Sequence, residues 1–305
     1  LHSAPPDSPL RGLGLSQQQF QPIDMPQRRS PCPSSKHERL LKEVDLKTKY
    51  FSIIILASIL ITGCGQKPAE NSSAKVSASP LAVNTLSAAV IDPAAAATVK
   101  GKVLFEGAAP AVQEFLVRGN PECAALHPGG KIQSEEFVVN NGALQNVFVY
   151  VKEGLEGRSY PVPSQAVTIE NKNCVYVPHV IGAQVGQQVN LLNSDPTLHN
   201  VHSFSKNSKA WNLGLPFQGM KQTKKFEAAE VMVHLKCDVH PWMSGYVGVL
   251  PHPYFSVTDG NGIFEIKNLP PGEYLIEAWH EKLGVRSQKI RIEPQETKEI
   301  EFKFQ

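Results

Sequence analysis

Apolar and polar residues alternate along most of the chain beyond residue 97, which is the period-2 pattern of half-buried β-strands. The alternating segments end at glycine, proline or asparagine turns and lie at 98–107, 144–154, 165–171, 187–195, 230–238, 244–250, 262–268, 272–281, 287–294 and 298–304. Helical periodicity is weak, and only PECAAL at 121–126 predicts one short helical turn. Many short strands between turn residues predict an all-β protein built of sandwiches or barrels.

Upstream of the strands, residues 47–64 have the pattern of an export signal. A basic flank precedes an apolar run at 50–61 that is too short to span a bilayer. The sequence ITGC, which ends at Cys64, resembles a bacterial lipobox, in which the cysteine is lipidated. We therefore expect an exported protein that Cys64 anchors to a bacterial membrane, facing the periplasm or the cell exterior. A cleaved signal peptide without lipid, or a short buried helix, is the alternative.

Two further segments near the N-terminus predict no packed core. Residues 1–46 are rich in Pro, Ser, Gln and Arg and precede a complete export signal, so we interpret them as a non-native or disordered extension. Residues 65–97 are small and polar with little periodicity, which is typical of a flexible tether.

Bulk composition and net charge exclude fewer classes of function than the positions of the cysteines do. The formal net charge is +2 and dense basic runs are absent, so the sequence gives no reason to expect a nucleic-acid partner. The chain contains neither H-E-x-x-H nor G-x-S-x-G, which removes two common hydrolase signatures. Five cysteines are spread over the chain at positions that suggest different roles.

The stretch LKCDVHPWMSGYVGVL at 235–250 places Cys237, His240 and Met243 within seven positions. A thiolate, an imidazole and a thioether are all ligands of soft transition metals, and a type 1 copper site needs one further imidazole. SDPTLHNVHSF at 194–204 offers His199 or His202 after a predicted strand. The two lie three apart in an extended segment, so their side chains point to opposite faces and only one of them is expected to bind.

These two segments together resemble the blue copper proteins, or cupredoxins, and are most similar to amicyanin and then to plastocyanin. The resemblance covers about residues 165–250 and implies a Greek-key sandwich that holds one type 1 copper ion. By this resemblance the copper ligands are His199, Cys237, His240 and Met243. Asn200, directly after His199, could use its backbone or side-chain amide to tie the two ligand loops together. In that family an apolar patch surrounds an exposed C-terminal histidine, so Pro241 and Trp242 are the expected docking patch beside His240.

Other readings of the same residues remain open. A zinc site could use cysteine and histidine, but zinc rarely takes a thioether, which would leave Met243 unused. Cys237 could instead be a buried structural thiol, or it could pair with Cys123 or Cys174. If it binds copper, Cys123 and Cys174 are left over, and two unassigned thiols of an exported protein most simply form a disulfide. His127 near Cys123 and His179 near Cys174 also suggest a second metal site.

The C-terminal segment 254–293 resembles the second half of a carboxypeptidase regulatory-like domain. Its motif T-D-x-x-G-x-F-x-I-x-x-L-P-P-G-x-Y spans 258–274, and the segments at 99–110 and 146–154 look like the missing first half. We therefore expect a cupredoxin domain at 164–251 inserted into a small sandwich made of 98–163 and 252–305. Two consecutive domains are the alternative.

The resulting hypothesis is a membrane-tethered blue copper protein that carries single electrons between redox partners outside the cytoplasm. The partners would be cytochrome-like or oxidoreductase-like proteins, and no catalytic activity is expected. Copper storage, delivery or sensing at the cell surface is the second hypothesis. A structural β-sandwich binding module that has only kept the cupredoxin form is the third.

Overall fold

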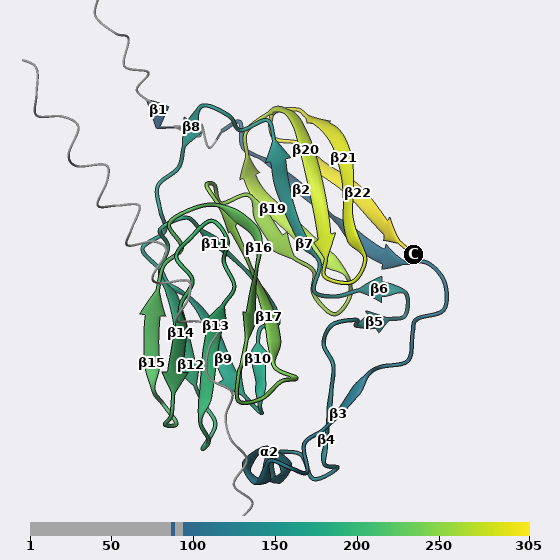
Figure 1. Ribbon diagram of the computed structural model, residues 1–305. Coiled ribbons are helices and arrows are strands. Elements are labelled where there is room, and N and C mark those ends of the chain that lie inside the picture. The colour runs from purple at the N-terminus through teal and green to yellow at the C-terminus, as the bar shows by residue number, and fades with distance from the viewer. Residues whose placement is uncertain (1–86, 89–93) are drawn as a thin grey trace, which may run out of the picture. The chain divides into compact units, whose positions relative to one another are not determined.

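The computed structural model describes residues 87–88 and 94–305 of the 305-residue chain (Figure 1). The expected extension at 1–46, the signal segment with Cys64 and most of the tether at 65–97 lie outside the described residues. Within the described part, Ser87–Ala88 form β1, which pairs in parallel with β8, Arg158–Ser159. The helix in this part has six residues, and no helix of these residues is long and apolar enough to cross a membrane.

The prediction of an all-β protein is confirmed, because the described residues form four sheets of four or five strands, two strand pairs and one short helix. Two of the sheets make up what we call the flanking sandwich, whose strands come from both ends of the described chain. One sheet contains β2 (Ala97–Phe105), β5 (Val139–Asn140), β6 (Ala143–Leu144), β19 (Ile263–Leu269) and β22 (Thr297–Phe304). The other contains β7 (Phe148–Glu153), β18 (Phe255–Val257), β20 (Gly272–His280) and β21 (Gly284–Ile292).

The connection between the two parts of the flanking sandwich is the long segment between β7 and β18. These two strands pair antiparallel, with Phe255 opposite Tyr150, although about a hundred residues separate them in the sequence. β2 likewise pairs with both β19 and β22, and β7 with β20, so neither part has a complete sheet of its own. The alternating residues on these strands form one apolar cluster that includes Val99, Val149, Phe264, Ile276 and Phe302.

The segment between β7 and β18 forms the central sandwich. Its first sheet has the order β10 (Val175–Val177), β9 (Val167–Lys172), β12 (Val189–Asn193) and β15 (Lys221–Lys224). Its second sheet has the order β11 (Val180–Gln184), β17 (Ser244–Leu250), β16 (Glu230–Lys236), β13 (His199–Ser203) and β14 (Asn212–Leu215). Inward-facing residues of both sheets, such as Ile169, Leu191, Val201, Val233 and Val247, make a second apolar cluster.

A third unit, which we call the arm, consists of residues 106–138 between β2 and β5. It contains β3 (Glu114–Leu116), the short helix α2 (Pro121–Leu126) and β4 (Lys131–Gln133), and β3 pairs antiparallel with β4. In Figure 1 the chain runs from the end of β2 through β3 to α2 and returns through β4 to β5, and α2 lies beyond β9 and β10 of the central sandwich. Asn120 caps α2, because its side-chain oxygen accepts a hydrogen bond from the Cys123 N–H at 3.3 Å.

An apolar cluster joins the two sandwiches. Phe148 and Tyr150 of the flanking sandwich pack with Val180 and Leu250 of the central sandwich. Gly248 leaves room for the Phe148 ring, because a Cβ built there would lie 2.3 Å from a ring atom. A Cβ at Gly182 would lie 2.2 Å from the Phe255 ring. Glycine at these two strand positions therefore lets the aromatic rings lie directly against the neighbouring backbone.

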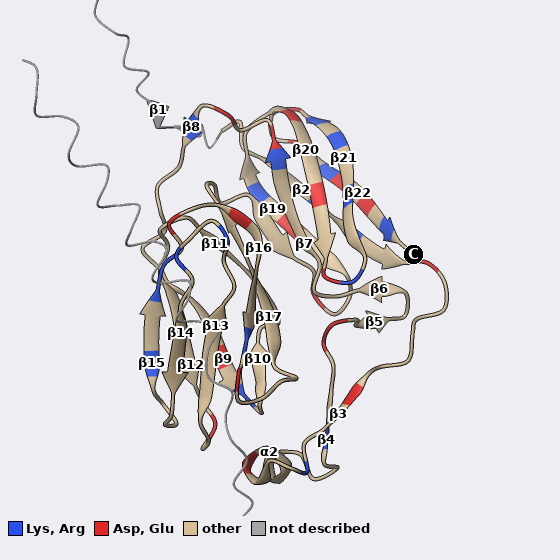
Figure 2. Cartoon of the chain, viewed as in Figure 1, with Lys and Arg blue, Asp and Glu red and all other residues tan. Residues whose placement is uncertain are grey.

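Charged side chains of both signs lie on the surface of the flanking sandwich. In Figure 2, β20 carries red bands, the neighbouring β21 carries blue bands, and β22 carries both. Several of these side chains pair, as Lys100 does with Glu299 at 3.0 Å and Lys303 with Glu106 at 2.8 Å. Exposed pairs of this kind contribute little to stability.

Two buried histidines make the flanking sandwich sensitive to acid. Burial lowers the pKa of His252 and of His280 to about 4, and the Nδ1 of each accepts a backbone hydrogen bond. The unfolded chain binds more protons than the folded chain between pH 4 and 6.5. The contribution of the two neutral histidines to the free energy of unfolding is therefore fully present above pH 6.5 and is lost as the pH falls toward 4.

We expect unfolding in urea to show a loss of roughly 2 kcal/mol per histidine between pH 7 and 5. His252→Gln should reduce this loss, and an unaltered loss in this variant would contradict the assignment.

Candidate metal centre

The predicted ligands come together at one end of the second sheet of the central sandwich. His199 is the first residue of β13, Cys237 directly follows β16, and Met243 directly precedes β17. β13 runs antiparallel to β16, with His202 opposite Lys236, and β16 runs antiparallel to β17, with Lys236 opposite Ser244. The start of β13, the end of β16 and the start of β17 therefore lie at the same end of the sheet.

Three of the four predicted ligands face one another. One potential ligand atom from each of His199, Cys237 and His240 lies within 4.8 Å of the other two. The Nδ1 atoms of the two imidazoles are 3.0 Å apart, and Cys237 Sγ is 3.7 Å from His240 Nδ1. Both histidines are fully buried and Cys237 is nearly so. Met243 is buried in the same apolar cluster as Cys237, and backbone hydrogen bonds between Met243 and both Cys237 and His240 close the loop that carries them.

The surroundings of Cys237 favour its thiolate form. Burial alone would raise the pKa of the thiol, but hydrogen bonds with His199 and His240 and with the backbone of Asn200 outweigh this effect and lower the pKa to about 6. A thiolate is the form that binds metal ions. The pKa of His199 is raised, because its hydrogen bonds to Asp195 and Cys237 outweigh the opposing effect of burial.

Asn200 joins the two ligand segments, as the sequence led us to expect. Its side-chain oxygen accepts a hydrogen bond from the Asp238 N–H at 2.7 Å and lies 3.2 Å from Cys237 Sγ. Its side-chain nitrogen donates to Asn212 and to the Asp238 carboxylate. The single side chain therefore fixes the start of β13 to the loop that follows β16.

Replacing Asn200 with alanine should weaken metal binding. Partners that orient metal ligands typically contribute 10- to 100-fold to affinity, and we expect a loss of roughly that size in a competition titration with a copper chelator. Asn190→Ala is the matched control, because Asn190 lies on β12 and its side chain bonds Thr223 on the neighbouring strand. Equal affinities of the two variants would show that Asn200 does not support the site.

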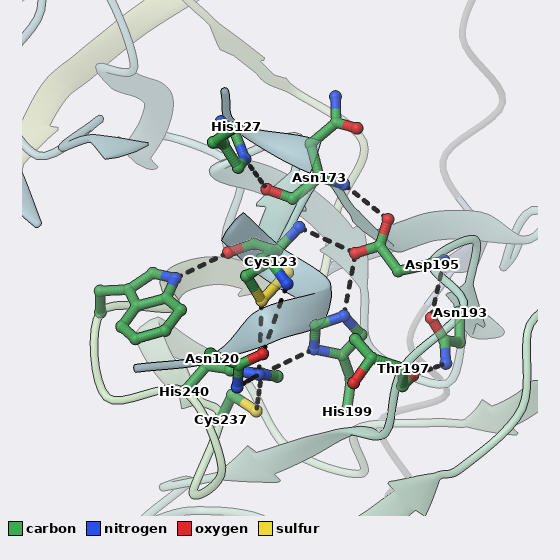
Figure 3. Close-up of a disulfide and its surroundings, with 12 residues drawn as sticks. Asn120, Cys123, His127, Asn173, Asn193, Asp195, Thr197, His199, Cys237 and His240 are labelled. Carbon is green, nitrogen blue, oxygen red and sulfur yellow. Dashed lines mark hydrogen bonds and ion pairs between the residues drawn. A yellow bond between two sulfur atoms is a disulfide. The ribbon is translucent and has the colours of Figure 1, made fainter. Parts of the chain in front are cut away.

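Asp195 holds the outer nitrogen of His199. Its carboxylate accepts a hydrogen bond from His199 Nε2 at 2.9 Å, from the Asn173 N–H at 2.7 Å and from the Cys174 N–H at 2.8 Å (Figure 3). Asn173 and Cys174 form the two-residue turn between β9 and β10, and both have φ of +54°, the left-handed conformation of a type I′ turn. The turn thus directs two adjacent N–H groups at the carboxylate that orients a ligand histidine.

The structure contains a disulfide between Cys123 of α2 and Cys174 of this turn, with an S–S distance of 2.05 Å. Among the described residues Cys237 is the free cysteine, so its pairing with either of the others does not occur. His127 donates from Nε2 to the Asn173 carbonyl, and His179 pairs with Glu281. Neither histidine belongs to a cluster of metal-ligating side chains in the described residues, so the structure does not assemble the second metal site that we considered.

The expectation that His240 has an exposed edge is wrong. Its exposed fraction is 0% because α2 lies over it, with Asn120 Nδ2 2.8 Å and Cys123 Sγ 3.5 Å from His240 Nε2 (Figure 3). Of the expected docking patch, Pro241 is exposed. Trp242 is half-buried and packs against the apolar cluster around the disulfide, and its indole N–H donates to the Cys174 carbonyl at 3.0 Å.

His202 takes no part in the cluster, in line with the expectation that only one of His199 and His202 would bind. Its ring stacks on Phe204 with centroids 4.2 Å apart, and its Nδ1 is 3.2 Å from the Asp238 carboxylate. Sequence reasoning missed the roles of Asp195 and Asn120. Asn120 before Pro-Glu is the sequence signal of a helix start, but such a signal does not predict a contact with a residue 120 positions away.

The donor set fits a soft transition metal. Two imidazole nitrogens and one thiolate sulfur in a buried pocket are the three strong ligands of a type 1 copper site. Met243 lies on the same loop as Cys237 and His240 and has the thioether that such a site uses as its weak axial ligand. The three strong ligands alone also suit zinc, so the geometry selects N and S coordination and the thioether residue favours copper.

Comparison with known proteins gives likenesses over part of the chain. No protein-family model matches, and no curated protein is similar at the level of sequence. Among solved structures, the purple cupredoxin from Nitrosopumilus maritimus is 27% identical over 27% of this chain and 98% of its own, with a TM-score of 0.24. The copper(I) form of an amicyanin variant is 23% identical over 29% of this chain and 85% of its own, with a TM-score of 0.25. A copper-containing nitrite reductase from Thermus scotoductus is 17% identical over 50% of this chain and 28% of its own, with a TM-score of 0.27.

Proposed function

We propose that the protein is a type 1 blue copper protein that carries single electrons between redox partners. The observation that supports this most is the convergence of His199, Cys237 and His240 in a pocket closed to solvent. Copper held there would supply a one-electron couple between Cu(I) and Cu(II). We propose one copper ion, with Met243 as the weak axial ligand.

The residues around the ligands would keep the site nearly unchanged during electron transfer. Asp195 fixes the ring of His199, Asn200 fixes the loop of Cys237, and backbone hydrogen bonds fix Met243 to His240 and Cys237. A preorganised set of ligands needs little rearrangement when the charge of the ion changes. The proposal includes no substrate site and no catalytic residue, because the electron passes to and from partner proteins.

We also propose that the protein is anchored to a membrane and lies outside the cytoplasm. Its support is the sequence pattern at 47–64, in which lipidation of Cys64 would anchor the chain to a bacterial membrane. The partners would be cytochrome-like or oxidoreductase-like proteins on the same side of that membrane. Labelling with a radioactive fatty acid, lost in Cys64→Ala, would test the anchor.

Reversible electron uptake separates this proposal from copper storage or delivery. The copper-loaded protein should accept and release one electron per copper over repeated cycles in voltammetry, while an intense visible absorption disappears and returns. Copper that leaves the protein for a competing chelator as soon as it is reduced would instead indicate delivery. A wild-type protein that binds copper without that absorption would exclude the type 1 site.

A further inference from the structure

The arm places α2 over the side of the metal centre that carries His240. Asn120, which caps the helix, contacts His240 Nε2, and Cys123 in its first turn lies against the same nitrogen. The Asn120 amide nitrogen donates to His240 Nε2 while its oxygen accepts from the Cys123 N–H, so the same side chain caps the helix and holds the imidazole. His240 is therefore both positioned and shut off from solvent by a segment that lies outside the central sandwich.

The disulfide is the covalent connection that holds this segment in place. It joins Cys123 of α2 to Cys174 of the turn between β9 and β10, and the two cysteines are 51 residues apart in the sequence. Two hydrogen bonds support it on either side, from His127 Nε2 to the Asn173 carbonyl and from the Trp242 indole to the Cys174 carbonyl. The apolar cluster around it is small: its buried members are Val117, Cys123, Ile132 and Cys174. Such a cluster is a weak anchor without the covalent bond.

The same disulfide is connected to the outer nitrogens of both ligand histidines. On one side, Cys123 is in α2, whose cap Asn120 holds His240. On the other side, the Cys174 N–H donates to Asp195, which holds His199. Figure 3 shows these contacts meeting at the disulfide. His199, Cys237 and His240 are each at most 2% exposed, so solvent has no access to their ligand atoms.

We infer that α2 is a cover pinned by the Cys123–Cys174 disulfide, with Asn120 as a positioning residue for His240, and that the disulfide controls access of solvent and metal to the centre. The part concerning metal rests on the proposed function, whereas the part concerning solvent holds for the metal-free protein. With the cover in place, metal exchange requires α2 to open. Without the disulfide, α2 is held only by a few contacts and opens far more often.

Chemical labelling of the metal-free protein tests the cover. Diethylpyrocarbonate acylates accessible imidazoles, and mass spectrometry of peptides gives the rate at each histidine. In the wild type we expect His202, whose side chain is 31% exposed, to react and His240 to stay unmodified. In Cys123→Ala/Cys174→Ala, His240 should react at least about tenfold faster, while the rate at His202 stays the same.

Phe148→Ala is the matched control, because it weakens the cluster between the sandwiches and leaves the disulfide intact. His240 should stay protected in it. The inference is overturned if His240 of the wild type reacts as fast as His202, a result that needs no variant to fold. It is also overturned if His240 stays protected in the double variant with a native circular dichroism spectrum, or becomes reactive in Phe148→Ala with a native spectrum.

Copper release tests the consequence for the metal. The Cu(I) form is mixed with excess bathocuproine disulfonate, and we expect release to be roughly tenfold or more slower from the wild type than from the double variant. Equal release rates would overturn control by the disulfide. A wild type that shows protected His240 but binds no copper would refute the proposed function and leave the cover standing, so the two failures are distinguishable.

Discussion

Cys237→Ser is expected to abolish the intense visible absorption of the copper-loaded protein and to weaken copper binding by more than about 100-fold. The absorption of a type 1 site comes from charge transfer between the thiolate and Cu(II), and a hydroxyl cannot supply it. Outer partners of ligands already contribute 10- to 100-fold in affinity, so loss of a direct ligand should exceed this range. The effect should be large because the thiol has a pKa of about 6 and is mostly ionised at neutral pH in the metal-free site.

Met243→Leu is the control for this prediction. The thioether is the weak axial ligand in our proposal, so the variant should keep the absorption and change mainly the reduction potential. Absorption spectra and chelator competition on the two variants give the result directly. A visible band that survives in Cys237→Ser would contradict the assignment of the thiolate, and a band lost only in Met243→Leu would reverse the roles that we give the two residues.

Phe148→Ala should lower the free energy of unfolding by roughly 3–5 kcal/mol. The Phe148 ring is fully buried between the two sandwiches, with its centroid 5.4 Å from that of Tyr150 and 5.5 Å from that of Phe255. The backbone at Gly182 and Gly248 already lies against the ring, so neither strand has a side chain that could fill the cavity left behind. Urea unfolding monitored by fluorescence measures the change.

Phe217→Ala provides the comparison, because its side chain is 71% exposed and its loss should change stability by no more than about 0.5 kcal/mol. Copper-loaded Phe148→Ala should keep the wild-type spectrum, since Phe148 belongs to a cluster that contains none of the ligands. A loss of stability below about 1 kcal/mol would mean that the sandwiches are not packed through this residue.

Much of the site could be predicted from the sequence because its chemistry is local. Cys237, His240 and Met243 lie on one loop, and the spacing alone shows three soft ligands within a few residues. The two-residue period of a strand indicated that only one of His199 and His202 would bind, and the resemblance to the blue copper proteins chose His199. In the structure His202 points away to Phe204 and Asp238. The all-β fold could be predicted for the same reason, since alternation is a local signal.

The cover over His240 could not be predicted, because it depends on contacts across the chain. The resemblance covered about residues 165–250 and therefore carried no information about a segment at 117–127. A six-residue helix gives almost no periodic signal, and the contact between Asn120 and His240 spans 120 positions. The disulfide could be proposed from the two remaining cysteines, but its position against a metal ligand depends on where the arm folds. For this reason the expectation of an exposed His240 was wrong.

X-ray absorption at the copper edge of the loaded wild-type protein tests the central claim most directly. If His199, Cys237 and His240 bind one ion, the spectrum should show one short copper–sulfur contact and two imidazole nitrogens in the same first coordination sphere. A sphere of nitrogen and oxygen alone, with no sulfur, would contradict the claim.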